Sequence, residues 1–122
     1  MRHCYRNAAN VLTDLVADKN MTALVGEDVT IPCETRESKN MPVNWYYLPS
    51  EHGEGSEICV AGNIVNGFRT RFAQGRSAVG EYPLIIRNVT REDKGEYLCI
   101  ENAGVGQIHR WRLTIIGKIA KC

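Results

Sequence analysis

From residue 21 onward the chain consists of short runs with apolar residues at every second position, separated by turn residues. Val29, Ile31 and Cys33 are spaced in this way, and a period of two is typical of a strand with one buried face. The run from Val43 to Leu48 is rich in aromatic and β-branched residues, which favour strands. Further strands are expected at 57–60, 63–65, 67–72, 82–86, 95–100 and 109–116. Without a long helical period, this pattern predicts an antiparallel all-β sandwich or barrel.

The amino-acid composition excludes several functional classes of protein. The chain has 122 residues, of which 43% are hydrophobic and 24% charged, as in a single globular domain. Its 15 Lys and Arg residues and 14 Asp and Glu residues leave a net charge of +1. A dedicated nucleic-acid binder carries a strong basic excess, so this balance argues against that class. The sequence also has no apolar run long enough to span a membrane.

Both ends of the chain fit the strand pattern less well. The N-terminus lacks the apolar stretch of a secretion signal, which leaves either a mature fragment with an added Met1 or a cytosolic protein. Residues 11–16 could line one helical face, but we prefer a leader segment at 1–13 and a domain at 14–117 that begins with an edge strand. Residues 118–122 are then a C-terminal tail, and the chain is interpreted as a fragment of a longer one.

Several residues occur at spacings that are typical of one family. Trp45 follows Cys33 by 12 residues, Cys99 follows Cys33 by 66, and the run 93–99 reads D-x-G-x-Y-x-C. In these features the chain resembles immunoglobulin superfamily domains of variable-type length. Antibody variable domains carry Phe-Gly-x-Gly after the last cysteine, whereas residues 100–104 here resemble intermediate-set domains of adhesion molecules and invertebrate receptors. The resemblance covers 14–117 and implies a two-sheet antiparallel Greek-key sandwich.

The resemblance also implies roles for single residues. A disulfide between Cys33 and Cys99 would join the two sheets, with Trp45 packed against it and Tyr97 forming a tyrosine corner. Arg71 and Asp93 would form a salt bridge at the base of the sandwich. By the same alignment the core would also contain Val29, Ile31, Val43, Leu84, Ile86, Val89, Leu113 and Ile115.

Three cysteines remain: Cys4, Cys59 and Cys122. At most one further internal bridge can form, and Cys4 with Cys122 is one pairing that the chain length allows. Cys59 is expected on an edge strand, where it would be free, bonded to Cys4 or bonded to another chain. Sequence alone leaves the connectivity open.

Two sequons point to the compartment. Asn20-Met21-Thr22 and Asn88-Val89-Thr90 are acceptors for N-linked glycans. Together with a disulfide they favour an oxidising, extracellular setting, with glycosylation expected at Asn20 and Asn88.

Catalytic and metal-binding patterns are not evident in the sequence. His52 and His109 lie outside any hydrolase or metalloprotease motif, and the cysteines and histidines lack the close pairs of a zinc site. We therefore expect a domain that binds rather than catalyses, with no cofactor and no metal. A sandwich enzyme or metal protein is the remote alternative.

Strand alternation predicts where the domain binds. Trp45 and Cys99 point inward, so their neighbours should form an exposed apolar patch with an arginine rim, which usually marks an interface. The predicted partner-binding residues are Tyr46, Leu48, Leu98, Ile100, Arg110 and Arg112. Alternatively, the leader at 1–13 covers the patch. Other candidate sites are the loops 34–42, 61–67 and 101–107, and a basic cluster that could bind sulfated glycans or be a solvated surface (Arg69, Arg76, Arg87, Arg91, Lys94).

The resemblance and these features predict a non-catalytic extracellular recognition module of a cell-surface receptor or adhesion protein, immune or developmental. It would bind a protein partner, or a second copy of itself, through one sheet face. We expect it to bind no nucleic acid, and to be attached to a membrane only through other parts of a longer chain. The alternative is a secreted domain that forms a homodimer, either non-covalent or linked through Cys59 or Cys122.

Overall fold

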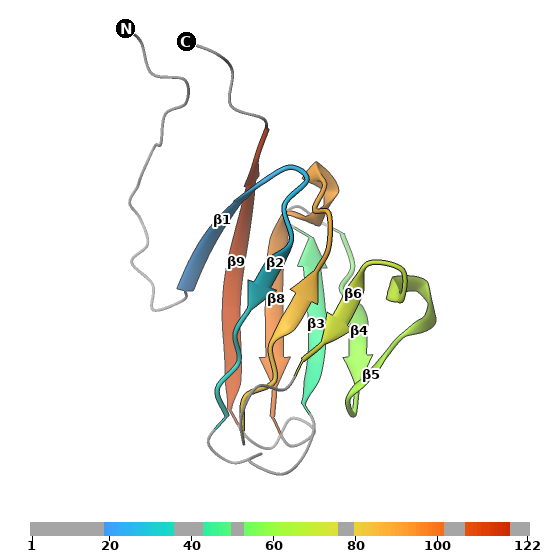
Figure 1. Cartoon of the computed structure of the whole chain (residues 1–122). Coiled ribbons are helices and arrows are strands. Elements are labelled where there is room, and N and C mark those ends of the chain that lie inside the picture. The colour runs from blue at the N-terminus through green and yellow to red at the C-terminus, as the bar shows by residue number, and fades with distance from the viewer. Residues whose placement is uncertain (1–18, 36–42, 50–52, 76–79, 102–106, 118–122) are drawn as a thin grey trace, which may run out of the picture.

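The structure, a computed structural model, describes residues 19–35, 43–49, 53–75, 80–101 and 107–117. Within these residues two facing sheets form a sandwich, with β1, β9, β8, β3, β4 and β5 in one and β2, β7 and β6 in the other (Figure 1). This confirms the predicted all-β, two-sheet fold. The strand bounds are β1 Lys19–Leu24, β2 Val29–Ile31, β3 Asn44–Pro49, β4 Ser56–Val60, β5 Asn63–Ile64, β6 Phe72–Gln74, β7 Leu84–Ile86, β8 Gly95–Ile100 and β9 Ile108–Ile116.

The larger sheet is built on three long neighbouring strands. β8 pairs antiparallel with β3, placing Trp45 opposite Cys99, and antiparallel with β9, placing Leu98 opposite Arg110. β1 joins the other side of β9 in the parallel direction. Figure 1 shows β1 and β9 at one edge of this sheet and the β4–β5 hairpin at the other.

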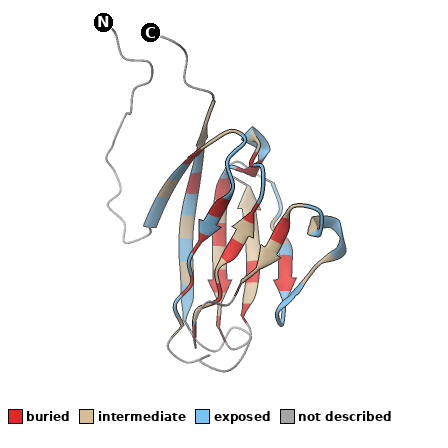
Figure 2. Ribbon diagram, in the orientation of Figure 1, coloured by how far each residue is buried: buried red, intermediate tan, exposed pale blue. Residues whose placement is uncertain are grey.

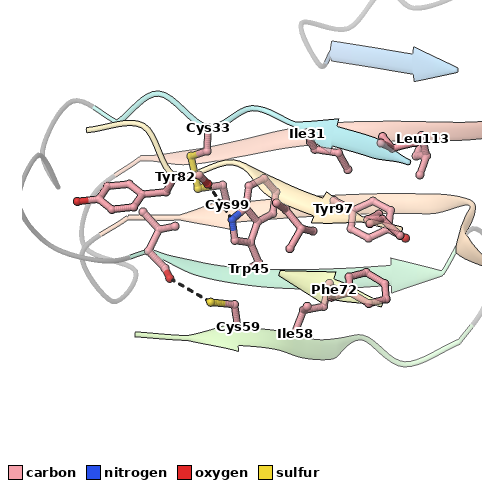
Figure 3. Packing of buried hydrophobic residues seen from close by; sticks show 14 of the residues in the cluster. Ile31, Cys33, Trp45, Ile58, Cys59, Phe72, Tyr82, Tyr97, Cys99 and Leu113 are labelled. Carbon is pink, nitrogen blue, oxygen red and sulfur yellow. Dashed lines mark hydrogen bonds between the residues drawn. A yellow bond between two sulfur atoms is a disulfide. The ribbon is translucent and has the colours of Figure 1, made fainter. Parts of the chain in front are cut away.

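A disulfide and an indole join the two sheets. Cys33, just after β2, is bonded to Cys99 of β8, with their Cα atoms 6.4 Å apart. Beside the bridge, the fully buried Trp45 donates a hydrogen bond from Nε1 to the Tyr82 carbonyl at 3.1 Å (Figure 3). Tyr82 in turn donates its backbone N–H to the Cys33 carbonyl at 3.0 Å. The larger sheet is therefore held to the smaller by one covalent bond and one buried hydrogen bond at the same level of the core.

The buried core follows the alternation of the strands (Figure 2). Seven of the eight further core positions named from the sequence are buried, and the eighth, Ile115, is half-buried and packs against them. The core also contains apolar residues that the sequence reading did not name: Ala23, Ile58, Cys59, Phe72 and Tyr82.

The strand predicted at 67–72 was wrong. Residues Asn66–Phe68 form a short 3-10 helix (η1), and β6 begins only at Phe72. The backbone N–H of Phe68 bonds to the Val65 carbonyl and that of Arg71 to the Phe68 carbonyl, so this segment pairs within itself. It carries the chain from β5 of the larger sheet to β6 of the smaller sheet. It first pairs with the smaller sheet at its end, where the Arg71 carbonyl accepts the backbone N–H of Arg87 at 2.8 Å.

Arg71 and Asp93 close the base of the sandwich. The guanidinium donates to both carboxylate oxygens of Asp93, at 2.8 and 3.0 Å, and this hydrogen bonding raises the pKa of Arg71. The same carboxylate accepts the backbone N–H of Thr90 at 2.8 Å and completes the capping box of the 3-10 helix Arg91–Asp93 (η2). The buried Tyr97 hydroxyl donates to the Asp93 carbonyl at 2.5 Å. Asp93 thus fixes β6, η2 and β8 relative to one another.

Replacing both bridge cysteines, Cys33→Ala with Cys99→Ala, should lower the free energy of unfolding by about 4 kcal/mol, because the bond closes a loop of 66 residues in the unfolded chain. Chemical denaturation of the oxidised protein and the double variant measures this difference. Equal denaturation midpoints would show that the bridge does not constrain the chain.

Asp93→Ala should destabilise the fold by about 3 kcal/mol, because it removes a nearly buried partner of Arg71 and the cap of η2 together. Glu92→Ala, at the exposed neighbouring position in η2, is the matched control and should stay within about 0.5 kcal/mol of the unmodified protein. If the two variants unfold at the same denaturant concentration, Asp93 does not have this role.

Candidate functional site

The candidate site is the side of the larger sheet that points away from the core, here called the outer face. Strand alternation assigns side chains to it because Trp45, Tyr97 and Cys99 point inward and are buried. Paired positions in neighbouring strands point to the same side, so the register extends the face across the sheet. The outer face is made of Asn44, Tyr46 and Leu48 on β3; Glu96, Leu98 and Ile100 on β8; Ile108, Arg110, Arg112 and Thr114 on β9; and Asn20 and Thr22 on β1.

An apolar strip crosses the middle of the outer face. Tyr46 lies opposite Leu98 on the neighbouring strand, and Ile100 lies opposite Ile108. Among the large apolar residues that the structure describes, Val60 and Ile108 are exposed. Ile108 is the more exposed of the two, at 56%. We define the apolar strip as Tyr46, Leu48, Leu98, Ile100 and Ile108.

The four predicted patch residues are half-buried, so the expectation that they would be exposed was wrong. Part of the reason is the segment before β4, whose backbone crosses the strip at Gly55. A Cβ added to Gly55 would overlap Tyr46 Cε2 and would lie 2.8 Å from Leu48 Cδ2. The chain itself thus covers one end of the strip with the 53–55 segment and leaves the Ile108 end open. The alternative cover, residues 1–13, lies outside the described residues.

A three-residue charge cluster borders the strip. Glu96 accepts a hydrogen bond from Arg110 Nη1 at 3.1 Å and another from Arg112 Nη2 at 3.0 Å. The two predicted rim arginines are therefore held on one carboxylate across β8 and β9. Both remain partly exposed, and exposed ion pairs of this kind contribute little to stability.

The sequence reading missed a buried carboxylate at the end of β8. Glu101 is 0% exposed, and its Oε2 lies 2.6 Å from Nε2 of His109. The backbone N–H of Glu101 donates to the Gln107 carbonyl at 3.1 Å. Glu101 therefore anchors both flanks of the last hairpin. A polar residue in a predicted loop gave no signal for this burial.

Cys59 lies in the core rather than on an edge strand, so that prediction was wrong. Cys59 is 0% exposed. β4 is not the last strand of its sheet, because β5 pairs with its other edge. Among the described cysteines it is the free one. Its Sγ lies 3.5 Å from Gln74 Nε2 and 4.0 Å from the Val43 carbonyl, and burial raises the pKa of its thiol (Figure 3). A buried thiol cannot bond to another chain while the domain is folded.

The two sequons occupy different surfaces. Asn20 and Thr22 are exposed on β1, at the edge of the outer face. Asn88 is exposed in a turn next to the smaller sheet, with a φ of 53°, and its backbone N–H donates to Asp28 Oδ1 at 2.9 Å. Glycosylation at both sites stays a prediction.

Several other predicted sites lie wholly or partly outside the described residues. These include Cys4, Cys122, His52, Arg76 and most of loops 34–42 and 101–107. Loop 61–67 is described and contains a tight turn, in which Ala61 and Gly62 both have positive φ, followed by the start of η1. Arg69, of the basic cluster, donates to the Ile64 carbonyl, while Arg87, Arg91 and Lys94 are exposed.

The residues that the structure describes contain neither a candidate metal site nor a candidate membrane-spanning helix. No group of three His, Cys, Asp or Glu side chains there is arranged to hold a metal ion. In the same residues no helix has the length and apolar character needed to cross a membrane.

With the sandwich, its bridge and the outer face established, comparison with known proteins gives the family. The immunoglobulin V-set domain model matches residues 16–115. The chain belongs to the immunoglobulin V-set family, whose domains are binding and recognition modules. The V-set match supports the variable-type length, whereas the intermediate-type hairpin concerns residues 100–104, most of which are outside the described part.

Two relatives are antibody light-chain variable regions. The mouse (Mus musculus) Ig kappa chain V-V region EPC 109 is 24% identical over 86 residues, covering 69% of this chain and 77% of that protein. The rabbit (Oryctolagus cuniculus) Ig kappa chain V region 3368 is 31% identical over 80 residues, covering 66% of this chain and 71% of that protein.

Cys59 should be inert to a maleimide in the native domain and should react once the domain is unfolded without reductant, because its sulfur is inaccessible and burial keeps it a neutral thiol. Mass spectrometry after labelling with and without guanidinium measures this. A control variant, Thr30→Cys on the exposed side of β2, should react in the native state. Rapid native labelling of Cys59 would contradict its placement in the core.

Proposed function

We propose that this domain is an extracellular, non-catalytic recognition module of a cell-surface receptor or adhesion protein and that it binds a protein partner through the outer face. The V-set family supports the recognition role, and the disulfide and sequons support the extracellular setting. Its relatives are antibody variable regions, which is consistent with a role in immunity.

The observation that carries the proposal is the pairing of the apolar strip with the arginine rim. Tyr46, Leu98 and Ile108 lie on three adjacent strands, so they form one continuous surface rather than scattered apolar residues. Interface centres are enriched in Tyr, other aromatics and Arg, and the charged residues lie at their edges. Arg110 and Arg112, held on Glu96, match that edge.

The alternative is a secreted domain that forms a homodimer through the same face. A covalent link through Cys59 would require the core to open. A covalent homodimer of the folded domain would therefore be linked through Cys122. Electrophoresis with and without reductant distinguishes a covalent dimer from a monomer.

A double variant tests the face directly. Tyr46→Glu with Ile100→Glu places two charges on the strip and should reduce binding to a partner by about a hundredfold or more, because a charge buried without a counter-ion costs several kcal/mol. The partner is sought by screening the tetramerised domain against an array of purified extracellular domains. Sedimentation equilibrium of the domain alone measures self-association.

Thr30→Glu is the matched control, because Thr30 is an exposed, outward-pointing residue of the smaller sheet. It should leave both binding and self-association unchanged, and circular dichroism should show all variants folded. Unchanged binding and unchanged sedimentation for the double variant would exclude the outer face as the docking surface.

A further inference from the structure

The sequon on β1 lies on the outer face itself. Asn20 is in register with Arg112, and Thr22 with Thr114, in the parallel β1–β9 pair. The residues between and after them, Met21 and Ala23, pack against the core. The side chains of Asn20 and Thr22 therefore point away from the core, to the same side as Arg112 and the apolar strip.

Asn20 lies at one edge of the outer face, closer to β9 than to β3. Strands are about 4.8 Å apart, so Asn20 is one spacing from Arg112 on β9 and about 14 Å from β3, where Tyr46 lies. A sugar ring is comparable in width to one such spacing. A shallow hollow of about 660 Å³ extends from β9 to β3 and has Leu48, Glu96, Arg112 and Thr114 among its lining residues.

We propose that Asn20 carries an N-linked glycan that covers the outer face around Arg112, at the β1–β9 edge, and confines partner docking to the apolar strip. This inference rests on the proposed extracellular function. The polar sugars extend over the Glu96–Arg112 pair, whose charged groups they can hydrogen-bond. Ile108 lies four residues from Arg112 along β9, so this end of the apolar strip remains open. The glycan thereby selects which part of the outer face meets a partner.

Attachment of the glycan is a group transfer to the Asn20 side-chain amide. A bond forms between Asn20 Nδ2 and C1 of the first N-acetylglucosamine of a lipid-pyrophosphate-linked oligosaccharide. The bond between that C1 and the pyrophosphate breaks, the lipid pyrophosphate leaves, and the amide loses one proton. No electron transfer is involved.

The second sequon provides the contrast. Asn88 lies beside the smaller sheet, where its backbone bonds to Asp28 and its carbonyl accepts from Arg71 at 3.5 Å. Asn88 follows β7 of the smaller sheet, so a glycan there would not lie on the outer face of the larger sheet. Removing it should have no effect on the outer face.

The test uses the full chain, secreted from glycosylating cells behind a cleavable signal. Two synthetic antibody fragments are selected on enzymatically deglycosylated protein, one that loses binding on Arg112→Glu and one that loses binding on Tyr46→Glu. Glycopeptide mapping should find sugar on Asn20. The intact glycan should weaken the Arg112-dependent fragment about tenfold or more and leave the Tyr46-dependent fragment within about twofold.

Thr22→Ala removes this sequon while keeping Asn20, and it should restore binding of the Arg112-dependent fragment. The matched control is Asn88→Gly, which removes the other sequon and tolerates the positive φ at that position; it should change neither fragment's binding. Absence of sugar on Asn20 would overturn the inference. Equal binding of the Arg112-dependent fragment to the glycosylated parent protein and to Thr22→Ala would also overturn it.

These fragments do not depend on a natural partner, so their results separate the two proposals. If Asn20 is glycosylated and shields Arg112 but the double strip variant still binds its partner, the proposed function fails and the glycan inference stands. If the fragments bind equally while the strip variant loses its partner, the reverse holds.

Discussion

The Cys33–Cys99 bridge, with Trp45 packed beside it, is the constraint on which the rest of the structure depends. It connects β8 to the end of β2, and the hydrogen bond from Trp45 to Tyr82 repeats that connection through side chain and backbone. Once Trp45 and Cys99 point inward at paired positions, alternation fixes the direction of the other side chains on β3 and β8. A shift of one residue in either strand would bury the apolar strip and expose the bridge.

The sandwich separates its stabilising and its binding contacts by side of the sheet. On the inner side, buried apolar residues and the Asp93 cluster hold the two layers together. On the outer side, ion pairs centred on Glu96 contribute little energy but hold Arg110 and Arg112 in place. The outer surface can therefore change its residues with small cost to folding, which suits a domain whose role is recognition.

Much of the fold could be predicted from the sequence because alternation and motif spacing are local signals. The strand at 43–48 followed from its aromatic and β-branched residues, and most of the core positions followed from the resemblance to immunoglobulin domains. Segment 66–71 could not, since Phe68 and Phe72 have strand-like spacing although the chain there crosses between sheets. The order of strands within a sheet also has no local signal, so Cys59 was wrongly placed at an edge.

The sequence predicted which side of the sheet the site residues point to, but it did not predict how exposed their side chains are. Alternation placed Tyr46 and Leu98 on the outer face, yet their partial burial depends on Gly55, which returns over the strip from a loop. Extending the last predicted strand by one residue would have found Ile108. The contact between Glu101 and His109 depends on which residues meet across the last hairpin, and sequence spacing does not give that.

A peptide map of the native protein, digested without reduction after free thiols are blocked, tests the central claim most directly. We expect one cross-linked species that joins the Cys33 peptide to the Cys99 peptide, and a separate Cys59 peptide that carries the blocking group. Blocked Cys33 or Cys99, or a bridge from either to Cys59, would contradict the sandwich and the outer face derived from it.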